Sequence, residues 1–137
     1  MKVLDNIYSD IYDYENLYIA YLNARKGKRY RKEVLEFTNH LEENLITLQN
    51  ELIWKTYTVG KYREFYIFEP KKRLIMALPF RDRVIQWAIY QKINPFFEKQ
   101  YISHSYACIK GRGTHQAVEK LQYWLKKVHR QGKEYYY

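Results

Sequence analysis

The chain has 137 residues, with 24 Lys and Arg against 15 Asp and Glu, and its net charge is +9. This length fits one domain with a sizeable core. The positive excess favours a polyanionic partner, either nucleic acid or an anionic membrane surface. No apolar run approaches the roughly 20 residues of a spanning helix, and the start of the chain is too acidic for a signal or transit peptide. We therefore expect a cytoplasmic protein.

The cysteine, histidine and aromatic contents restrict further the kinds of site that the chain can form. A single cysteine, Cys108, excludes an internal disulfide, and the four histidines do not combine with it at zinc-site spacing. We therefore expect no structural metal. The 16 Tyr, 6 Phe and 3 Trp make base stacking chemically possible, although tyrosine at helical spacing usually packs at the rim of a core.

The first half of the chain predicts two helices joined by a basic run. Residues 14–24 form the first helix, because apolar side chains recur there at helical spacing. The run RKGKRYRK at 25–32 contains six basic residues, and it is either a solvated loop or a loop that contacts phosphates. A longer helix follows and buries one apolar stripe, which consists of Val34, Phe37, Leu41, Leu45, Leu48 and Leu52.

After Trp54 the apolar period becomes that of β-strands. TYTVGKYREFYIFE at 56–69 and RLIMALP at 73–79 predict an antiparallel hairpin whose tip carries Lys71, Lys72 and Arg73. Three cations on a stiff support can hold a triphosphate or a nucleic-acid backbone. The alternative is an edge hairpin that uses its cations to prevent aggregation.

The last third predicts two more helices around a glycine-containing loop. Helical spacing resumes at Val84, with Asp82 in the first turn, where a carboxylate favours the helix dipole, and Pro95 is expected to interrupt this helix. SHSYACIKGRGTH at 103–115 predicts a loop. A final helix follows from His115 and is expected to bury Ala117, Val118, Leu121, Trp124, Leu125 and Val128.

The predicted fold class is α+β, a mostly helical chain with one antiparallel hairpin. Residues 1–24 carry one lysine against four acidic residues, so the positive charge gathers in the 25–32 loop, the hairpin and the tail. A one-sided basic surface is what neutralisation of a nucleic-acid backbone requires.

Several motifs occur together in a fixed order. The segments RLIMALPFRDRVIQWAI and INPFFEKQYISHSYACIKGRGTHQAV resemble the fingers region of bacterial reverse transcriptases. In that family an Arg-x-x-x-x-x-Pro strand leads into an Asp-Arg-Val-x-Gln helix, a Pro-x-Phe-Glu segment and a Ser-Tyr-x-x-x-x-Gly-x-x-x-His-x-Ala loop. The upstream ENLYIAYLNARKGKRYRKEVLEF is similar to the amino-terminal extension of enzymes related to diversity-generating retroelement, retron and group II intron reverse transcriptases.

The resemblance implies a function for the basic residues. Arg73 matches the fingers arginine that contacts the triphosphate of the incoming dNTP, and Lys71 or Lys72 is expected to be its companion lysine at the hairpin tip. Asp82 and Arg83 are expected either to pair structurally and orient the helix under the template or to contact RNA directly. The expected nucleic-acid contacts are Arg25, Lys26, Lys28, Arg29, Arg31, Arg81, Arg83, Gln86, Lys110, Arg112 and His115.

The resemblance also shows what the chain lacks. Ile109 stands where relatives usually carry arginine, which puts a charge contact there in doubt. Nucleotidyl transfer needs carboxylates that hold two divalent metals, and the family supplies them from the palm, beyond Tyr137. We therefore expect no catalytic residue and no metal in these residues, and Mg²⁺ only in the full-length enzyme.

The resulting hypothesis is a fragment of an RNA-directed DNA polymerase, a nucleotidyltransferase of a retroelement. Its expected parts are a helical N-terminal extension at 1–53, the hairpin at 54–79 and a helical part at 80–137. Template RNA, an RNA/DNA duplex and dNTP are the expected partners, with no membrane. The alternatives are a stand-alone basic RNA-binding module without catalytic activity and a fragment that self-associates through the exposed apolar groups of its final helix.

Overall fold

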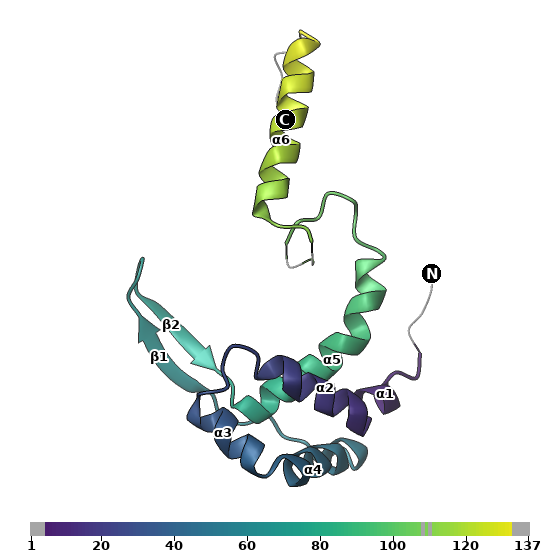
Figure 1. Ribbon diagram of the computed structural model, residues 1–137, viewed down its shortest axis with the longest axis vertical. Coiled ribbons are helices and arrows are strands. Elements are labelled where there is room, and N and C mark those ends of the chain that lie inside the picture. Colours follow the sequence, from purple (N-terminus) through teal and green to yellow (C-terminus); the bar gives the residue numbers. More distant parts are fainter. Residues whose placement is uncertain (1–4, 108, 110, 133–137) are drawn as a thin grey trace. The chain divides into compact units, whose positions relative to one another are not determined.

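A computed structural model describes residues 5–107, 109 and 111–132. The chain divides into two compact units, Met1–Phe96 and Phe97–Tyr137. Figure 1 shows the elements of the described residues in chain order. They are α1 (Tyr8–Tyr12), α2 (Tyr14–Ala24), α3 (Lys32–Asn39), α4 (Leu41–Ile53), β1 (Arg63–Ile67), β2 (Arg73–Ala77), α5 (Phe80–Glu98) and α6 (Thr114–Arg130). This content confirms the α+β class.

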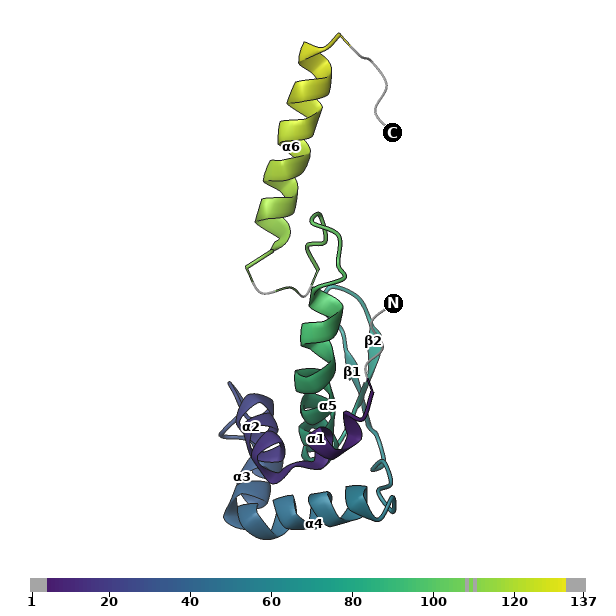
Figure 2. The ribbon, with the colours of Figure 1, turned by 90° about the vertical axis from the view of Figure 1, so that its right-hand side faces the viewer.

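The core of the first unit lies among α2, α3, α4 and α5. In both ribbon views α4 runs below α5 and the short α1 (Figures 1 and 2). The fully buried side chains of this core include Leu17, Tyr21, Val34, Leu45, Leu48 and Val84. Three aromatic rings join three of the helices, because Tyr21 of α2 packs against Phe37 of α3 and both meet Phe80 of α5.

The first helix follows its prediction closely, since α2 spans Tyr14–Ala24. Asp13 begins it as an N-cap, because its carboxylate accepts a hydrogen bond from the backbone N–H of Asn16 at 3.3 Å. Gly27, with φ of +71°, lies in the turn that follows and takes a backbone conformation that favours glycine.

The prediction of one long helix over 34–52 is wrong. The chain breaks at His40, whose φ of −122° and ψ of 46° are not helical, and this break separates α3 from α4. The side chain of Asn44 donates to the carbonyl oxygen of Phe37 at 3.0 Å, which satisfies an acceptor at the end of α3. Most of the predicted apolar stripe is nevertheless buried, because both short helices turn their apolar faces to the same core.

The predicted antiparallel hairpin is confirmed, but its strands are shorter than predicted. Arg63 pairs with Ala77, Phe65 with Ile75 and Ile67 with Arg73. Residues 56–62 precede β1 outside any strand, because Gly60 donates its N–H to a side chain of α5 and not to a strand partner. Every residue of β1 is exposed.

Two expectations for the last helices are also corrected. α5 continues through Pro95 to Glu98, since a proline removes one ladder hydrogen bond without preventing a further turn. α6 forms as predicted but buries none of its residues. The periodicity correctly indicates an amphipathic helix, although its apolar face packs into no buried core among the described residues. No helix in the described part of the chain is long and apolar enough to cross a membrane.

Candidate nucleic-acid interface

A groove of about 800 Å³ lies between the start of α3 and the root of the hairpin, and we call it the basic groove. One wall comes from residues 30–36, at the end of the basic loop and in the first turns of α3. The other wall comes from the hairpin, with Lys61, Arg63 and Phe65 on the incoming side and residues 77–79 on the outgoing side. Residues 30–36 therefore face two later segments of the chain, the incoming and the outgoing side of the hairpin, across this groove.

The positive charge of the basic groove is only partly neutralised. Two cations have acidic partners on α3: Lys32 Nζ lies 3.7 Å from Glu36, and Arg83 Nη2 lies 3.5 Å from Glu33. The other cations, Arg31, Lys61 and Arg63, form no ion pair with another described residue, and all three are exposed. A phosphate group can therefore approach them without displacing an internal partner.

Exposed rings accompany the unpaired cations. Tyr30 is 77% exposed on the α3 wall, and Phe65 is exposed on the hairpin wall. The guanidinium carbon of Arg63 lies 5.5 Å from the centroid of the Phe65 ring. Binding sites for single-stranded nucleic acid combine two components. One is a set of cations that follow the phosphate backbone, and the other is a set of rings on which the bases stack.

Arg83 connects the two walls. Its Nε and Nη2 donate to the carbonyl oxygen of Leu78 at 3.1 and 2.9 Å, and Nη2 also reaches Glu33. The expected pairing of Asp82 with Arg83 is therefore not what the structure shows, because each residue has other partners. The side chain of Arg83 is only 17% exposed, so its role in the groove is mainly to hold the walls together.

Asp82 is 2% exposed in the first turn of α5 and holds the chain that enters the hairpin. Its carboxylate accepts a hydrogen bond from the O–H of Tyr57. Both carboxylate oxygens also accept the backbone N–H of Gly60, at 3.3 Å each. Burial raises the pKa of Tyr57 above its ordinary value, and the hydrogen bond to Asp82 and the negative charge of that carboxylate raise it further.

This raised pKa predicts a loss of stability at alkaline pH. Above about pH 10 the unfolded chain releases the Tyr57 proton while the folded chain keeps it, so the free energy of unfolding should fall as pH rises through the folded pKa. Urea unfolding at about pH 9 and about pH 11 should show a smaller fall in Tyr57→Phe than in the wild type. An equal fall in both proteins would contradict the assignment.

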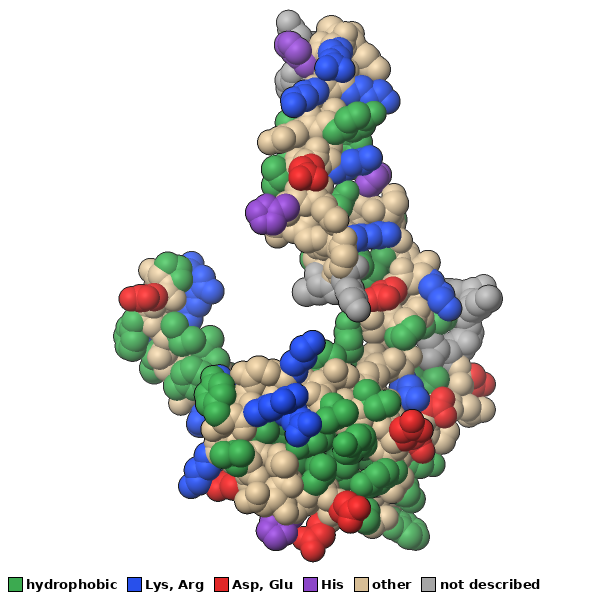
Figure 3. Space-filling model, viewed as in Figure 1, with side chains coloured by type: hydrophobic (Ala, Val, Ile, Leu, Met, Phe, Trp, Pro, Cys, Tyr) green, Lys and Arg blue, Asp and Glu red, His purple; other side chains and the backbone are tan. Residues whose placement is uncertain are grey.

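The other predicted cations of the N-terminal loop lie near the groove. Figure 3 shows Lys and Arg side chains gathered around the loop between α2 and α3. Lys26 and Arg29 are exposed there, and Lys28 is half-buried. Arg25 differs from them because its guanidinium lies 4.8 Å from the Tyr21 ring centroid and donates to the Tyr21 hydroxyl at 2.9 Å. It therefore anchors the loop to the core.

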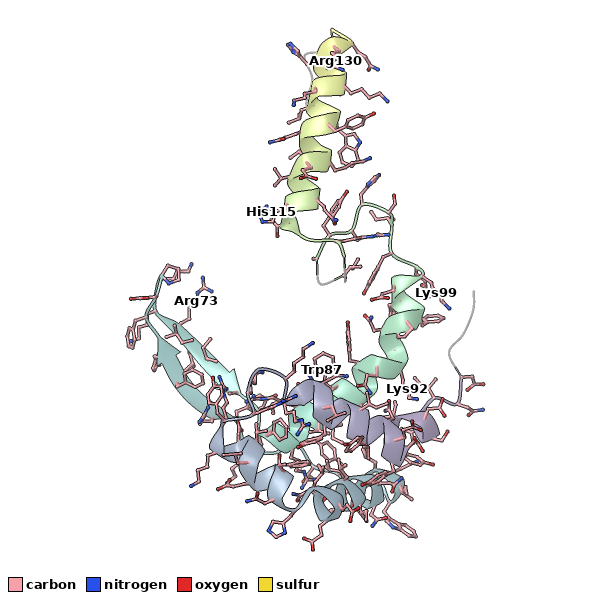
Figure 4. All side chains as sticks on the ribbon, in the orientation of Figure 1. Arg73, Trp87, Lys92, Lys99, His115 and Arg130 are labelled. Carbon is pink, nitrogen blue, oxygen red and sulfur yellow. The ribbon has the colours of Figure 1, made fainter. Side chains whose placement is uncertain are left out.

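The face of the hairpin that lines the basic groove continues outward to the hairpin tip. Arg63, Phe65 and Arg73 share one face of the hairpin, because their pairing positions alternate along the two strands. Arg73 lies at the outer end, as Figure 4 shows. Lys71 and Lys72 are exposed in the turn, where Lys72 Nζ lies 4.7 Å from the centroid of the Tyr66 ring.

The remaining predicted contacts lie elsewhere in the structure. Arg81 forms an ion pair with Glu51 of α4, while Gln86 is exposed on α5. In the second unit, Arg112 donates to the carbonyl oxygen of Ser103 at 3.2 Å, and His115 is exposed in the first turn of α6 (Figure 4). Lys110 lies outside the described residues. Of the predicted contacts that the structure describes, only Arg31 and Arg83 line the basic groove.

Sequence reasoning did not predict several residues that line the groove or hold it, among them Tyr30, Lys61, Arg63, Phe65 and Tyr57. Lys61, Arg63 and Phe65 were predicted as strand residues only, although the two-residue spacing of Arg63 and Phe65 places them on one face of a strand. No local sequence pattern identifies Tyr57 as the hydrogen-bond partner of Asp82, because 25 residues separate the two. Among the described residues, no group of three or more His, Cys, Asp and Glu side chains is arranged to hold a metal ion.

Comparisons with known proteins provide one distant relative. No protein-family model matches the chain. The chain is similar to nuclear intron maturase 2, mitochondrial, of Arabidopsis thaliana, with 27% identity over 96 residues. The match covers 58% of this chain and 13% of the maturase, so the chain spans only a small part of that protein. This likeness supports a distant relationship between the two.

Proposed function

We propose that the chain binds single-stranded RNA in the basic groove. The observation that carries the proposal is the facing arrangement of the unpaired cations Arg31, Lys61 and Arg63 with the exposed rings of Tyr30 and Phe65. In this arrangement the cations neutralise phosphates while bases stack on the rings. The distant relationship to an intron maturase supports RNA as the polyanion.

We further propose that this groove belongs to the fingers of a reverse transcriptase. Intron maturases are related to reverse transcriptases, and the order of motifs from Arg73 to Ala117 agrees with that relationship. The bound strand is then template RNA. The exposed tip cations Lys71, Lys72 and Arg73 contact the triphosphate of a dNTP in the complete enzyme, with Mg²⁺ supplied at the palm.

Titration of the chain with single-stranded RNA tests the binding proposal. A labelled oligonucleotide of about 12 nucleotides covers a typical single-strand site, and fluorescence anisotropy gives Kd over about 50 to 200 mM salt. Three neutralised phosphates predict a log–log slope of about −2 or steeper, since each contributes about −0.7 for a single strand.

Single-stranded DNA and duplex RNA of the same length serve as the comparison ligands. Duplex RNA should bind more weakly, because its paired bases cannot stack on Tyr30 and Phe65. Binding that does not weaken with salt would reject the electrostatic groove. Equal affinity for the duplex would show that the rings do not take part.

A further inference from the structure

The root of the hairpin is fastened at two points to one turn of α5. On the incoming side, Asp82 accepts the N–H of Gly60 and the O–H of Tyr57. On the outgoing side, Arg83 donates twice to the carbonyl oxygen of Leu78, just after β2. Consecutive residues of one helix therefore hold both ends of the hairpin.

The incoming contact is close as well as hydrogen-bonded. A Cβ atom at Gly60 would lie 2.8 Å from a carboxylate oxygen of Asp82 and 2.8 Å from Cγ of Pro79. The absence of a side chain therefore lets the backbone lie directly against α5. Lys61, the first residue of the hairpin wall of the groove, follows Gly60 immediately.

Packing gives the hairpin little additional support. All five residues of β1 are exposed, and in β2 only Ile75 and Ala77 are partly buried. An isolated pair of strands is marginally stable in water, so the direction of this hairpin depends strongly on its attachments at the root.

We infer that Asp82 is a positioning residue for RNA binding, which holds the wall bearing Lys61 and Arg63 at the proper separation from the wall bearing Arg31. This inference rests on the proposed function. Asp82 does not touch the RNA, because it is 2% exposed and its carboxylate is occupied by Tyr57 and Gly60. It acts through the backbone of residues 57–60, which lead directly into the groove wall.

Two variants at opposite ends of the same hydrogen bond test this inference. Tyr57→Phe removes the donor, and Asp82→Asn removes the charge and one of the acceptor oxygens. In each variant Kd for the single-stranded RNA should rise by about 3- to 10-fold, a fraction of the loss that a broken hydrogen bond to a charged group can cause. Because both substitutions break the same hydrogen bond, their effects should not add. The double variant should bind RNA only slightly more weakly than the single variant with the lower affinity.

Two further measurements distinguish positioning from direct contact and from general destabilisation. The salt slope should be equal to or shallower than that of the wild type, since neither variant adds a cation and a displaced wall carries Lys61 and Arg63 away from phosphate. Hydrogen exchange of the Gly60 amide, measured without RNA, should accelerate in Asp82→Asn while the α2 and α4 amides stay protected. Ile85→Val provides the control, because it removes one buried methylene from α5 without touching the hairpin root, and its Kd should be unchanged.

The outcomes separate the two proposals. If the wild type binds RNA but the folded Tyr57→Phe and Asp82→Asn proteins bind equally well, the positioning role of Asp82 is wrong while the groove stands. If Asp82→Asn binds RNA more tightly than the wild type, the carboxylate acts through its repulsion of phosphate and not by holding the wall, and the inference is also wrong. If the wild type itself does not bind, the proposed function fails first. Should Asp82→Asn not fold, Tyr57→Phe decides, because it removes only a hydroxyl group.

Discussion

Replacement of Phe80 by alanine should lower the free energy of unfolding by about 3 to 5 kcal/mol, the usual cost of removing a buried aromatic side chain. Phe80 is 2% exposed, and its ring centroid lies 5.3 Å from that of Phe37 and 6.2 Å from that of Tyr21. Both pairs are edge-to-face, a geometry that adds to the energy of burial. The substitution therefore opens a cavity where α2, α3 and α5 meet.

Urea unfolding followed by circular dichroism measures this effect. Phe65→Ala is the matched control, because it makes the same chemical change at an exposed position on β1, and it should cost well under 1 kcal/mol. Phe80→Leu should recover part of the lost stability by refilling the site. A loss below about 1 kcal/mol in Phe80→Ala would mean that the three rings do not form the centre of the core.

Removal of the unpaired cations should have the largest effect on binding. The triple variant Arg31→Ala, Lys61→Ala, Arg63→Ala should bind single-stranded RNA about 50-fold more weakly near 0.15 M salt, and its log–log salt slope should be shallower by about 2. Both values follow from the loss of three phosphate contacts at about 0.7 each. Stability should change little, because all three side chains are exposed and lack internal ion pairs among the described residues.

A charge-matched variant shows whether the place of the cations matters. Lys126→Ala, Lys127→Ala, Arg130→Ala removes the same charge from α6, in the second unit. Its affinity should fall less than that of the groove variant. Equal losses in the two triple variants would show that net charge alone drives binding and that the groove is not a site.

Local sequence signals predicted those parts of the fold that depend on neighbouring residues. α2 was predicted from its apolar spacing and from Gly27 after it, and the structure adds Asp13 as the cap at its start. The hairpin was predicted because the apolar residues change from helical spacing to strand spacing after Trp54. The break at His40 was missed because the apolar stripe continues with helical spacing across it, and periodicity reports the buried face of a segment more reliably than its continuity.

The candidate site depends on partners that are distant in sequence, and this is why it was predicted only in part. A basic surface follows from composition, but which cations are free depends on acidic partners such as Glu33, which lies 50 residues from Arg83. From sequence alone, Arg31, Arg81 and Arg83 were all predicted as nucleic-acid contacts, with a structural alternative for Arg83 alone. Among the residues that the structure describes, Arg31 has no acidic partner, whereas Arg81 pairs with Glu51 and Arg83 lies between two walls.

The fastening of the hairpin to one turn of α5 also affects how the molecule loses its structure. With β1 exposed throughout, the hairpin forms a cooperative unit that can open while the helical core stays packed. On heating, the affinity for RNA should decline before the helical signal does. A bound RNA strand that spans both walls should bring the temperatures of these two declines closer together, because a ligand stabilises only the closed form to which it binds.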